Sequence, residues 1–462
     1  MDTRRVARGE TDMTKGGIYS HIIRFALPIF ISMVFQQLYN TADSLIVGQF
    51  LGTEALAAVG SAGSLIFLMI SFFEGMFMGA GVLISRRYGE GDLEGVSRAA
   101  HTNVAIGLIS GVTLTVVGFF LTPTLLSWMN VDPEVMPRAV EYFSYFFLGS
   151  LGMVMYNVCR GMMSAVGDSR HPLYYLIFSS LLNIALDLLF VGVFRWNVWA
   201  AAVATVISQV LSAALCFARL MRRGGAVKIY LRRIRFHAES LKKIMKYGVP
   251  SGIQNSVIGL ANVIVQSQIN TFGKMAMAAF GVHARIEGFA FMPINSNCFA
   301  ITTFVGQNLG AGEHERAKKG ARFGILSAVT MAEVVGAIYF IFAPTLISAF
   351  DTTAQVVAFG TKQAHIEALF YCLLALSHAI ASVCRGADKA FVPMTVMLSV
   401  WCVFRVIYIY TVMHFFGTIN LIYWAYPITW AISSVIYIIY YLKSDWVHGF
   451  DKEKLREAAY EV

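Results

Sequence analysis

Carboxylate and amide side chains interrupt otherwise apolar stretches at a few positions in the first half of the sequence. Asp43 follows Asn40 by three residues and Gln36 by seven, which places the three side chains on one face of a helix. Asp187 follows Asn183 by about one helical turn. A carboxylate inside a membrane costs at least about 2.5–3.5 kcal/mol, so we interpret such residues first as functional.

A hydroxyl group adds to this set. Thr205 ends the run Ala201-Ala-Val-Ala-Thr205, whose small residues permit a neighbouring helix to approach closely. If the segments carrying Asp43, Asn183 and Asp187 converge on it, the oxygen ligands suit a hard cation such as Na⁺. Two nearby carboxylates repel each other and therefore also favour uptake of a proton. Na⁺ and H⁺ both remain open, and the alternative is that either aspartate only pairs with a neighbouring helix.

The composition shows which elements must position these groups. The chain has 462 residues, of which 57% are hydrophobic and 14% charged, whereas soluble domains carry roughly a quarter charged residues. Only helices or closed barrels satisfy their backbone hydrogen bonds in lipid, and apolar runs of roughly twenty residues or more indicate helices. We predict an all-α membrane protein of about twelve spans, at 22–47, 54–84, 100–121, 137–158, 172–193, 198–219, 247–272, 277–305, 322–344, 356–384, 393–416 and 420–442.

The charge distribution predicts an orientation. The net charge is +9, and the central loop 220–246 alone holds nine Lys and Arg residues against one acid, Glu239. Basic loops alternate with nearly uncharged ones, which predicts a multi-pass protein of the cell (inner or plasma) membrane with both termini in the cytoplasm. We expect the basic loop to contact anionic lipid headgroups rather than nucleic acid. The first twenty residues are polar and charged, so we expect no cleaved signal peptide.

The two halves of the chain resemble each other. Gly52-Thr-Glu-Ala-Leu-Ala-Ala-Val-Gly60 aligns with Gly273-Lys-Met-Ala-Met-Ala-Ala-Phe-Gly281, 221 residues later. An even number of spans per repeat predicts two six-helix bundles related by a pseudo-two-fold axis along the membrane normal. The predicted parts are an N-terminal tail, an N-terminal lobe, a basic linker, a C-terminal lobe and a C-terminal tail, at 1–20, 21–220, 221–246, 247–442 and 443–462.

Further polar residues within the spans are candidates for lining a cavity: Gln36, Asn40, Asn157, Gln254, Asn262, Gln266 and Glu287. For Glu287, a structural ion pair with Arg285 is an equally open interpretation. Pro28 lies early in the first span, where a proline removes a helical hydrogen bond and permits a kink. A static kink is the alternative to a bendable helix.

Over residues 15 to 442, the sequence resembles the multidrug and toxic compound extrusion (MATE) family. The resemblance lies in ordered motifs that include Asn40-Thr-Ala-Asp43-Ser-Leu-Ile-Val-Gly48, Asn183-Ile-Ala-Leu-Asp187 and Gly306-Gln-Asn-Leu-Gly-Ala-Gly312. It implies twelve helices in two lobes, and a cation site formed by Asp43, Asn183, Asp187, Thr205 and the carbonyl group of Ala201. Another branch of the family uses acids on its seventh and tenth helices, but the predicted seventh span here contains no acid.

The expected function is that of a secondary active exporter. The resemblance implies exchange of small organic cations for Na⁺ or H⁺ by alternating access, and we expect a monomer with no cofactor besides the coupling ion. The alternative is a lipid-linked saccharide flippase of the same superfamily. Twelve spans and buried acidic groups favour cation export. The sequence has no HExxH motif and no GxSxG turn, so we do not expect an enzyme.

Overall fold

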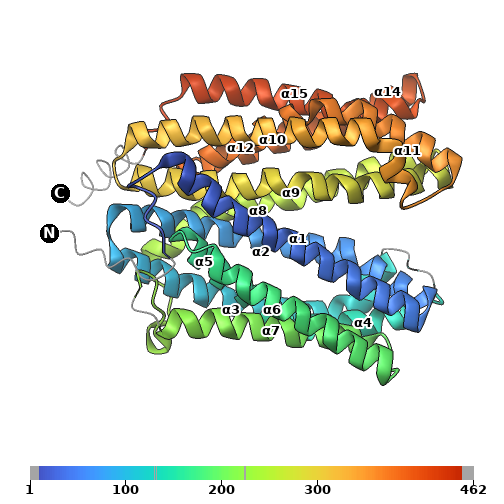
Figure 1. Cartoon of the computed structure of the whole chain (residues 1–462), viewed down its shortest axis with the longest axis horizontal. Helices are drawn as coiled ribbons and strands as arrows, with labels where there is room; N and C mark the ends of the chain where they lie inside the picture. Colours follow the sequence, from blue (N-terminus) through green and yellow to red (C-terminus); the bar gives the residue numbers. More distant parts are fainter. Residues whose placement is uncertain (1–9, 129–130, 132, 223–224, 450–462) are drawn as a thin grey trace. The chain divides into compact units, whose positions relative to one another are not determined.

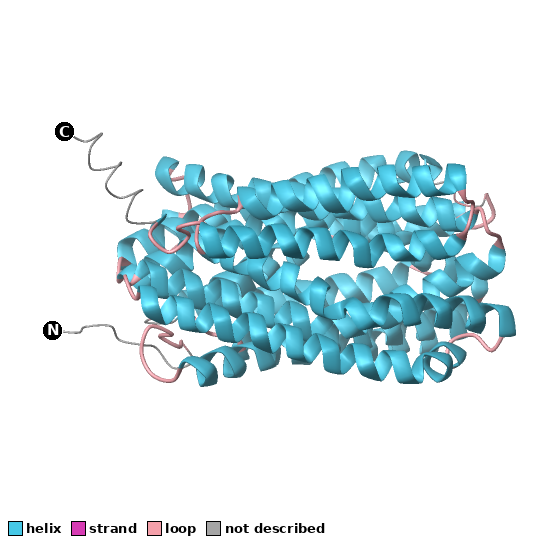
Figure 2. Cartoon of the chain, turned by 90° about the horizontal axis from the view of Figure 1, so that it is seen from above, coloured by secondary structure: helices cyan, strands magenta, loops and turns pink. Residues whose placement is uncertain are grey.

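The computed structural model describes residues 10–128, 131, 133–222 and 225–449, apart from side chains at 53, 57, 60–69 and 128. The secondary structure of these residues is helical (Figures 1 and 2). The α-helices are α1 (Ile18–Leu51), α2 (Thr53–Glu90), α3 (Leu93–Trp128), α4 (Met136–Leu148), α5 (Ser150–Ala165), α6 (Arg170–Asp187), α7 (Trp199–Arg222), α8 (Ala238–Asn270), α9 (Lys274–Gly310), α10 (His314–Ser348), α11 (Ala354–Glu367), α12 (Tyr371–Gly386), α13 (Phe391–Val396), α14 (Arg405–Phe415) and α15 (Ile419–Lys443). Short π-helical or 3₁₀ segments join them: η1 (Leu188–Val193), η2 (Leu231–Arg233), η3 (Ala368–Phe370) and η4 (Met397–Phe404).

Many of these helices are long and apolar enough to cross a membrane. Within the described residues, eight segments meet both conditions: Ile18–Leu51, Leu93–Ser127, Arg170–Val193, Trp199–Arg222, His314–Ser348, Ala354–Gly386, Phe391–Phe415 and Ile419–Lys443. The predicted span 137–158 falls on two short helices, α4 and α5, which are separated at Gly149. The other predicted spans fall on the long helices α2, α8 and α9. The predicted all-α membrane fold is confirmed by the solved structures described below.

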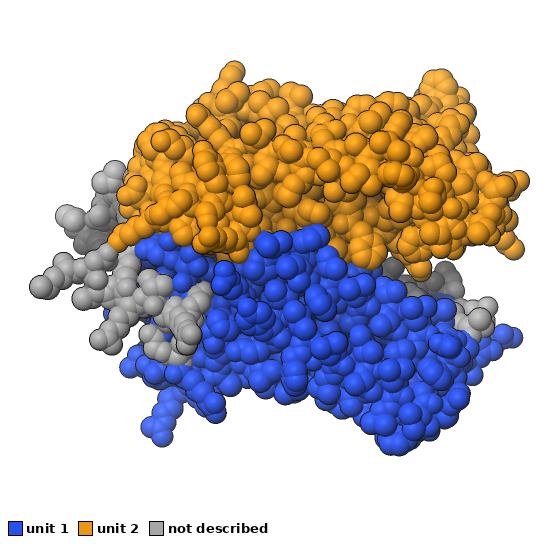
Figure 3. All heavy atoms as spheres, viewed as in Figure 1, with its two compact units in different colours: residues 1–12, 27–249 blue, residues 13–26, 250–462 orange. Residues whose placement is uncertain are grey.

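The chain forms two compact units (Figure 3). Unit 1 comprises 1–12 and 27–249, and unit 2 comprises 13–26 and 250–462, which leaves α1 and α8 divided between them. Both divided helices contain a proline close to the division, Pro28 in α1 and Pro250 in α8. Parts of the predicted tails, residues 1–9 and 450–462, and residues 223–224 of the predicted linker lie outside the described residues.

Small residues determine how closely the helices of unit 1 pack. Helix α3 packs against α2, α4 and α5, and α7 packs against α5 and α6. A Cβ atom at Gly79 of α2 would clash with the backbone of Gly248, and one at Gly248 would lie 2.7 Å from the carbonyl oxygen of Met76. The backbones of α2 and α8 therefore touch at this crossing, which a larger residue would force apart.

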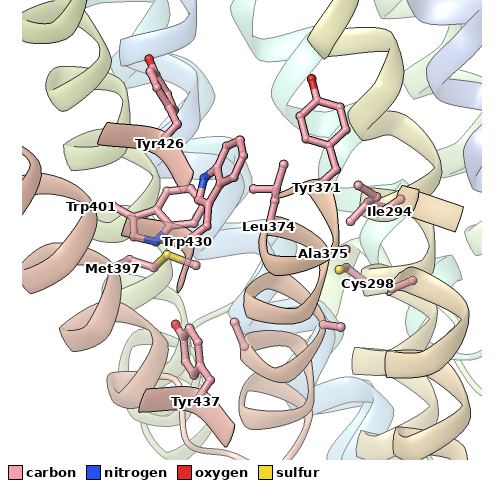
Figure 4. Close-up of a cluster of buried hydrophobic side chains, with 14 of the residues drawn as sticks. Ile294, Cys298, Tyr371, Leu374, Ala375, Met397, Trp401, Tyr426, Trp430 and Tyr437 are labelled. Carbon is pink, nitrogen blue, oxygen red and sulfur yellow. The ribbon is translucent and has the colours of Figure 1, made fainter. Parts of the chain in front are cut away.

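Aromatic side chains fill much of the core of unit 2. Helix α9 packs against α10, α11 and α12, and α12 packs against α15. Figure 4 shows Tyr371 of α12, Trp401 of η4 and Trp430 of α15 within this core. The indole nitrogen of Trp401 donates a hydrogen bond to Ser433 at 3.0 Å, so the polar edge of the buried ring has a partner.

Replacing Gly79 by Ala should destabilise unit 1, because the added methyl group has no space against the backbone of Gly248. We expect a loss of about 1–3 kcal/mol, typical of overpacking, measured as a lower melting temperature of the purified protein. Gly81→Ala is the matched control, since its Cβ would meet only the Gly161 carbonyl oxygen at 4.0 Å. Equal melting temperatures for the two variants would contradict the close crossing.

Candidate cation site in unit 1

A cavity of about 500 Å³ lies among the helices of unit 1. Asp43 of α1, Glu74 of α2 and Thr205 of α7 contribute polar groups to its wall. The full lining comprises Gln36, Tyr39, Asn40, Asp43, Ser44, Val59, Ile70, Ser71, Glu74, Tyr142, Phe146, Gly149, Ser150, Met153, Tyr156, Asn157, Thr205, Val206 and Gln209. Helical spacing explains the contribution of α1, because Gln36, Asn40 and Asp43 recur at intervals of four and three residues.

The start of α6 and the end of α7 are fixed by a polar cluster. The buried carboxylate of Asp168 lies 2.7 Å from Nδ1 of His171 and 3.7 Å from a guanidinium nitrogen of Arg219. These contacts join α6 to α7, which pack against each other. Small residues such as the alanines of α7 allow the two helices to approach closely. Three turns or more beyond this cluster, Asn183 of α6 donates a hydrogen bond to the Thr205 hydroxyl of α7 at 3.4 Å.

The two aspartates lie beside each other. Asp43 is 7% exposed and Asp187 is fully buried, and their carboxyl groups are close enough to interact directly. Among the described residues, no donor reaches Oδ1 of Asp43 or either carboxylate oxygen of Asp187. Oδ1 of Asn183 also has no partner there. Buried carboxylates in this state are unfavourable unless a proton or a cation compensates them.

A second, much smaller cavity of about 10 Å³ adjoins Asn183 and Thr205. The side chains around it are all polar: Tyr39, Ser179, Ser180, Asn183, Thr205, Ser208 and Gln209. Its volume corresponds to about one water-sized probe. The hydroxyl and amide groups of α6 and α7 could therefore surround a single small ion or water molecule.

Regular helix geometry breaks beside Asp187. Helix α6 ends at Asp187, and the chain continues as the π-helical segment η1. Such insertions in an α-helix frequently occur at functional sites, because they change the direction of side chains and loosen backbone hydrogen bonds. Ala201, whose carbonyl group the resemblance implicates, is fully buried in α7 one turn before Thr205.

The structure separates the predicted polar residues into two sets. Gln36, Asn40 and Asn157 line the larger cavity of unit 1 together with Asp43 and Thr205. Gln254, Asn262, Gln266 and Glu287 belong to unit 2, on α8 and α9. Gln254 is buried, Asn262 is exposed, Gln266 donates to Asn270 at 2.7 Å, and Glu287 lies beside His283 and Glu367.

Several residues of the unit 1 site have no distinct signal in the sequence. Tyr39 and Tyr142 are buried, and both interact electrostatically with Asp43 and Asp187. Gln209 donates to the Tyr39 hydroxyl at 3.3 Å. Tyrosine is common in membrane helices, so only the spacing of four residues between Tyr39 and Asp43 could have indicated a shared face.

Comparison with known proteins identifies the class to which this fold belongs. The chain is 28% identical over 437 residues to the probable multidrug resistance protein YoeA of Bacillus subtilis, covering 93% of this chain and 94% of that one. A transporter of the MOP superfamily from Pyrococcus furiosus matches with a TM-score of 0.88 at 25% identity, over 95% and 98% of the two chains. A multidrug resistance MATE transporter solved in an outward-facing conformation matches with a TM-score of 0.87 at 25% identity, over the same shares.

The protein is therefore a multi-pass membrane transporter and not an enzyme. The MatE family model matches residues 28–189 and 250–411. The chain belongs to this family, the MATE multidrug efflux transporters. The resemblance inferred from the sequence motifs is confirmed, and the double match agrees with the internal repeat.

Replacing Thr205 by Val should leave the buried Asn183 amide without its acceptor while conserving side-chain volume. An unsatisfied buried donor costs about 1–3 kcal/mol, so the melting temperature of the purified protein should fall. Thr205→Ser, which retains the hydroxyl, should melt close to the wild type. If the valine variant is as stable as the serine variant, the hydrogen bond does not hold α6 against α7.

Proposed function

We propose that this protein exports organic cations by secondary active antiport, with Na⁺ or H⁺ entering at Asp43 and Asp187. The observation that carries the proposal is the pair of adjacent, buried carboxyl groups, in which no donor among the described residues reaches Oδ1 of Asp43 or either oxygen of Asp187. A bound ion removes their mutual repulsion. Binding of the ion therefore stabilises this arrangement relative to any state in which the carboxyl groups separate or become hydrated.

The surrounding ligands fit either ion. Asn183, Thr205 and the carbonyl group of Ala201 add neutral oxygen atoms to the two carboxyl groups, which is the donor set expected for Na⁺. A proton needs only the carboxyl pair itself. The proposal therefore names one site for both ions, and a transport measurement has to choose between them.

Organic cations are the substrates that the unit 1 cavity favours. Tyr39, Tyr142, Phe146 and Tyr156 present aromatic rings, and Asp43 and Glu74 present carboxylates. Aromatic faces and carboxylates attract cations. None of the described residues lining this cavity is Lys or Arg.

The second candidate function is a lipid-linked saccharide flippase, which would require basic groups for the phosphates. In the Pyrococcus furiosus transporter, reverse polarity of the binding pocket suggests a different function for that protein. We use pocket charge to choose between the two functions for this chain, because phosphates bind basic groups and organic cations bind carboxylates and aromatic faces. The carboxylates in the cavity favour the export of cations here.

The remaining features follow from the charge pattern and the repeat. We propose that both termini and the basic linker face the cytoplasm, and that the linker contacts anionic lipid headgroups. We propose that the lobes 21–220 and 247–442 act within one monomer. Antiport then proceeds by alternating access, in which ion and drug compete for the outward-open state.

Pro28 supplies a mechanical link in this proposal. It lies in the same helix as Asp43, fifteen residues earlier, a distance of about 22 Å along the axis. Because proline interrupts the helical hydrogen bonds, α1 can bend there at little additional cost. Occupation of the site by an ion then biases the shape of the first helix.

Asp43→Asn and Asp187→Asn should each abolish gradient-driven efflux of a cationic dye such as ethidium from proteoliposomes. The substitutions remove the charge that the coupling ion compensates. Separate Na⁺ and pH gradients should be imposed, because the gradient that drives wild-type efflux identifies the ion. Asp351→Asn, outside the spans, is the control, because its backbone contact with Thr353 needs only the retained carbonyl oxygen. Full efflux by both site variants would exclude this site.

Pro28→Ala should slow transport without weakening ion binding. Alanine restores the missing hydrogen bond and is up to about 3 kcal/mol more favourable in a helix interior, which opposes bending. We expect unchanged ion-dependent thermal stabilisation and a lower rate of dye efflux. Pro123→Ala in α3 is the matched control for removal of an intrahelical proline. Wild-type efflux by Pro28→Ala would argue against a bending role.

A further inference from the structure

Three potential metal ligands converge in unit 2. His283 and Glu287 lie one turn apart on α9, and Glu367 ends α11. One ligand atom from each residue lies within 4.8 Å of the other two. His283 and Glu367 are buried and Glu287 is half-buried.

The spacing of these atoms resembles that of ligands around one ion. Nε2 of His283 lies 3.1 Å from Oε2 of Glu367. Two ligand atoms at about 2.1 Å from a tetrahedral metal are about 3.4 Å apart. The side chains would therefore need only small adjustments to bind one cation together.

Neighbouring groups orient the potential ligands. The Tyr339 hydroxyl of α10 lies 2.8 Å from Nδ1 of His283, which directs Nε2 toward the carboxylates. Gln363 donates from its amide nitrogen to Oε1 of Glu367 at 2.9 Å. Metal-binding histidines and carboxylates almost always have outer partners of this kind, which fix the ring and the charge.

The charges and unpaired oxygen atoms around the cluster favour a cation. Arg405 is buried and acts electrostatically on both glutamates, but one guanidinium balances only one of the two carboxylates. The second charge is balanced by a metal ion or, without one, by a proton on His283. Within the described part of the chain, Oε1 of Gln363 and the Tyr371 hydroxyl are buried without a hydrogen-bond partner. Tyr371, drawn in Figure 4, interacts electrostatically with both glutamates. These oxygen atoms are suited to a bound ion or to its water ligands.

We propose that His283, Glu287 and Glu367 bind a divalent transition-metal cation such as Zn²⁺ or Mn²⁺. One imidazole and two carboxylates, without a thiolate, form a donor set that suits these ions. The bound metal would connect α9 to α11 and stabilise unit 2. The site does not depend on the export function or on the carboxyl pair of unit 1.

The first test uses the purified full-length protein in detergent, after removal of metals with a chelator. We expect about one equivalent of Co²⁺ per chain to bind with the visible spectrum of nitrogen and oxygen ligation, and Zn²⁺ to displace it. Zn²⁺ should also raise the melting temperature. A wild-type protein that shows neither a Co²⁺ spectrum nor a thermal shift would overturn the proposal, leaving His283 and Glu367 as a buried ion pair.

Variants then locate the bound metal. Glu287→Gln and Glu367→Gln should each weaken metal binding at least about tenfold. Tyr339→Phe should also weaken metal binding, because the Tyr339 hydroxyl orients His283 although it is not itself a ligand. His365→Gln is the matched control, since His365 is exposed two residues from Glu367 and contacts the ring and the carbonyl oxygen of Phe340 rather than the cluster. Unchanged stoichiometric binding in both glutamate variants would place the metal elsewhere and overturn the assignment. If a variant does not fold, metal binding by the wild-type protein still decides the proposal. Dye efflux is measured separately, because it tests the export proposal and not metal binding.

Discussion

The burial of two carboxyl groups in an apolar helical unit is the constraint on which the site depends. Asp43 and Asp187 come from helices far apart in the sequence, and no donor among the described residues reaches Oδ1 of Asp43 or either oxygen of Asp187. An uncompensated pair of this kind is tolerated only if the surrounding helices give it fixed positions and a small cation or proton is available. Three features give the helices such positions. Helices α6 and α7 pack closely, Asp168 links the start of α6 to the end of α7, and Asn183 donates a hydrogen bond to Thr205.

This constraint also gives the proposed ion coupling a mechanical route. The carboxyl group of Asp43 lies on the same helix as Pro28, and α1 is divided between the two units close to that proline. An ion that changes the favoured position of Asp43 therefore acts on the helix that continues into unit 2. Coupling free energies of about 1–3 kcal/mol suffice to change affinities by one or two orders of magnitude. A single hydrogen bond gained or lost at a bend is of that size.

Much of the fold and part of the site were predictable from the sequence, because each rests on local patterns. Long apolar runs identify helices in lipid, and a carboxylate within such a run is conspicuous, as Asp43 and Asp187 are. The contacts between helices were not predictable in the same way. His283 and Glu367 are separated by 84 residues, and their proximity depends on the rotation of α9 and α11 about their axes. Tyr39 and Tyr142 gave no signal because tyrosine has many roles in membrane helices.

The two matches to the family model show that duplication preserved the scaffold but not its chemistry. They begin at residues 28 and 250, a shift of 222 residues, whereas the glycine motifs repeat at a shift of 221. At these two shifts Asp43 corresponds to Val265 or Ile264, and Asp187 to Ile409 or Tyr408. None of these residues is acidic, so unit 2 lacks carboxylates at the positions at which unit 1 carries Asp43 and Asp187. Unit 2 instead groups polar residues from α9, α10 and α11 around His283. Because packing and polar function rest on different positions of the same helices, one half could acquire an ion site without altering the framework that both halves share.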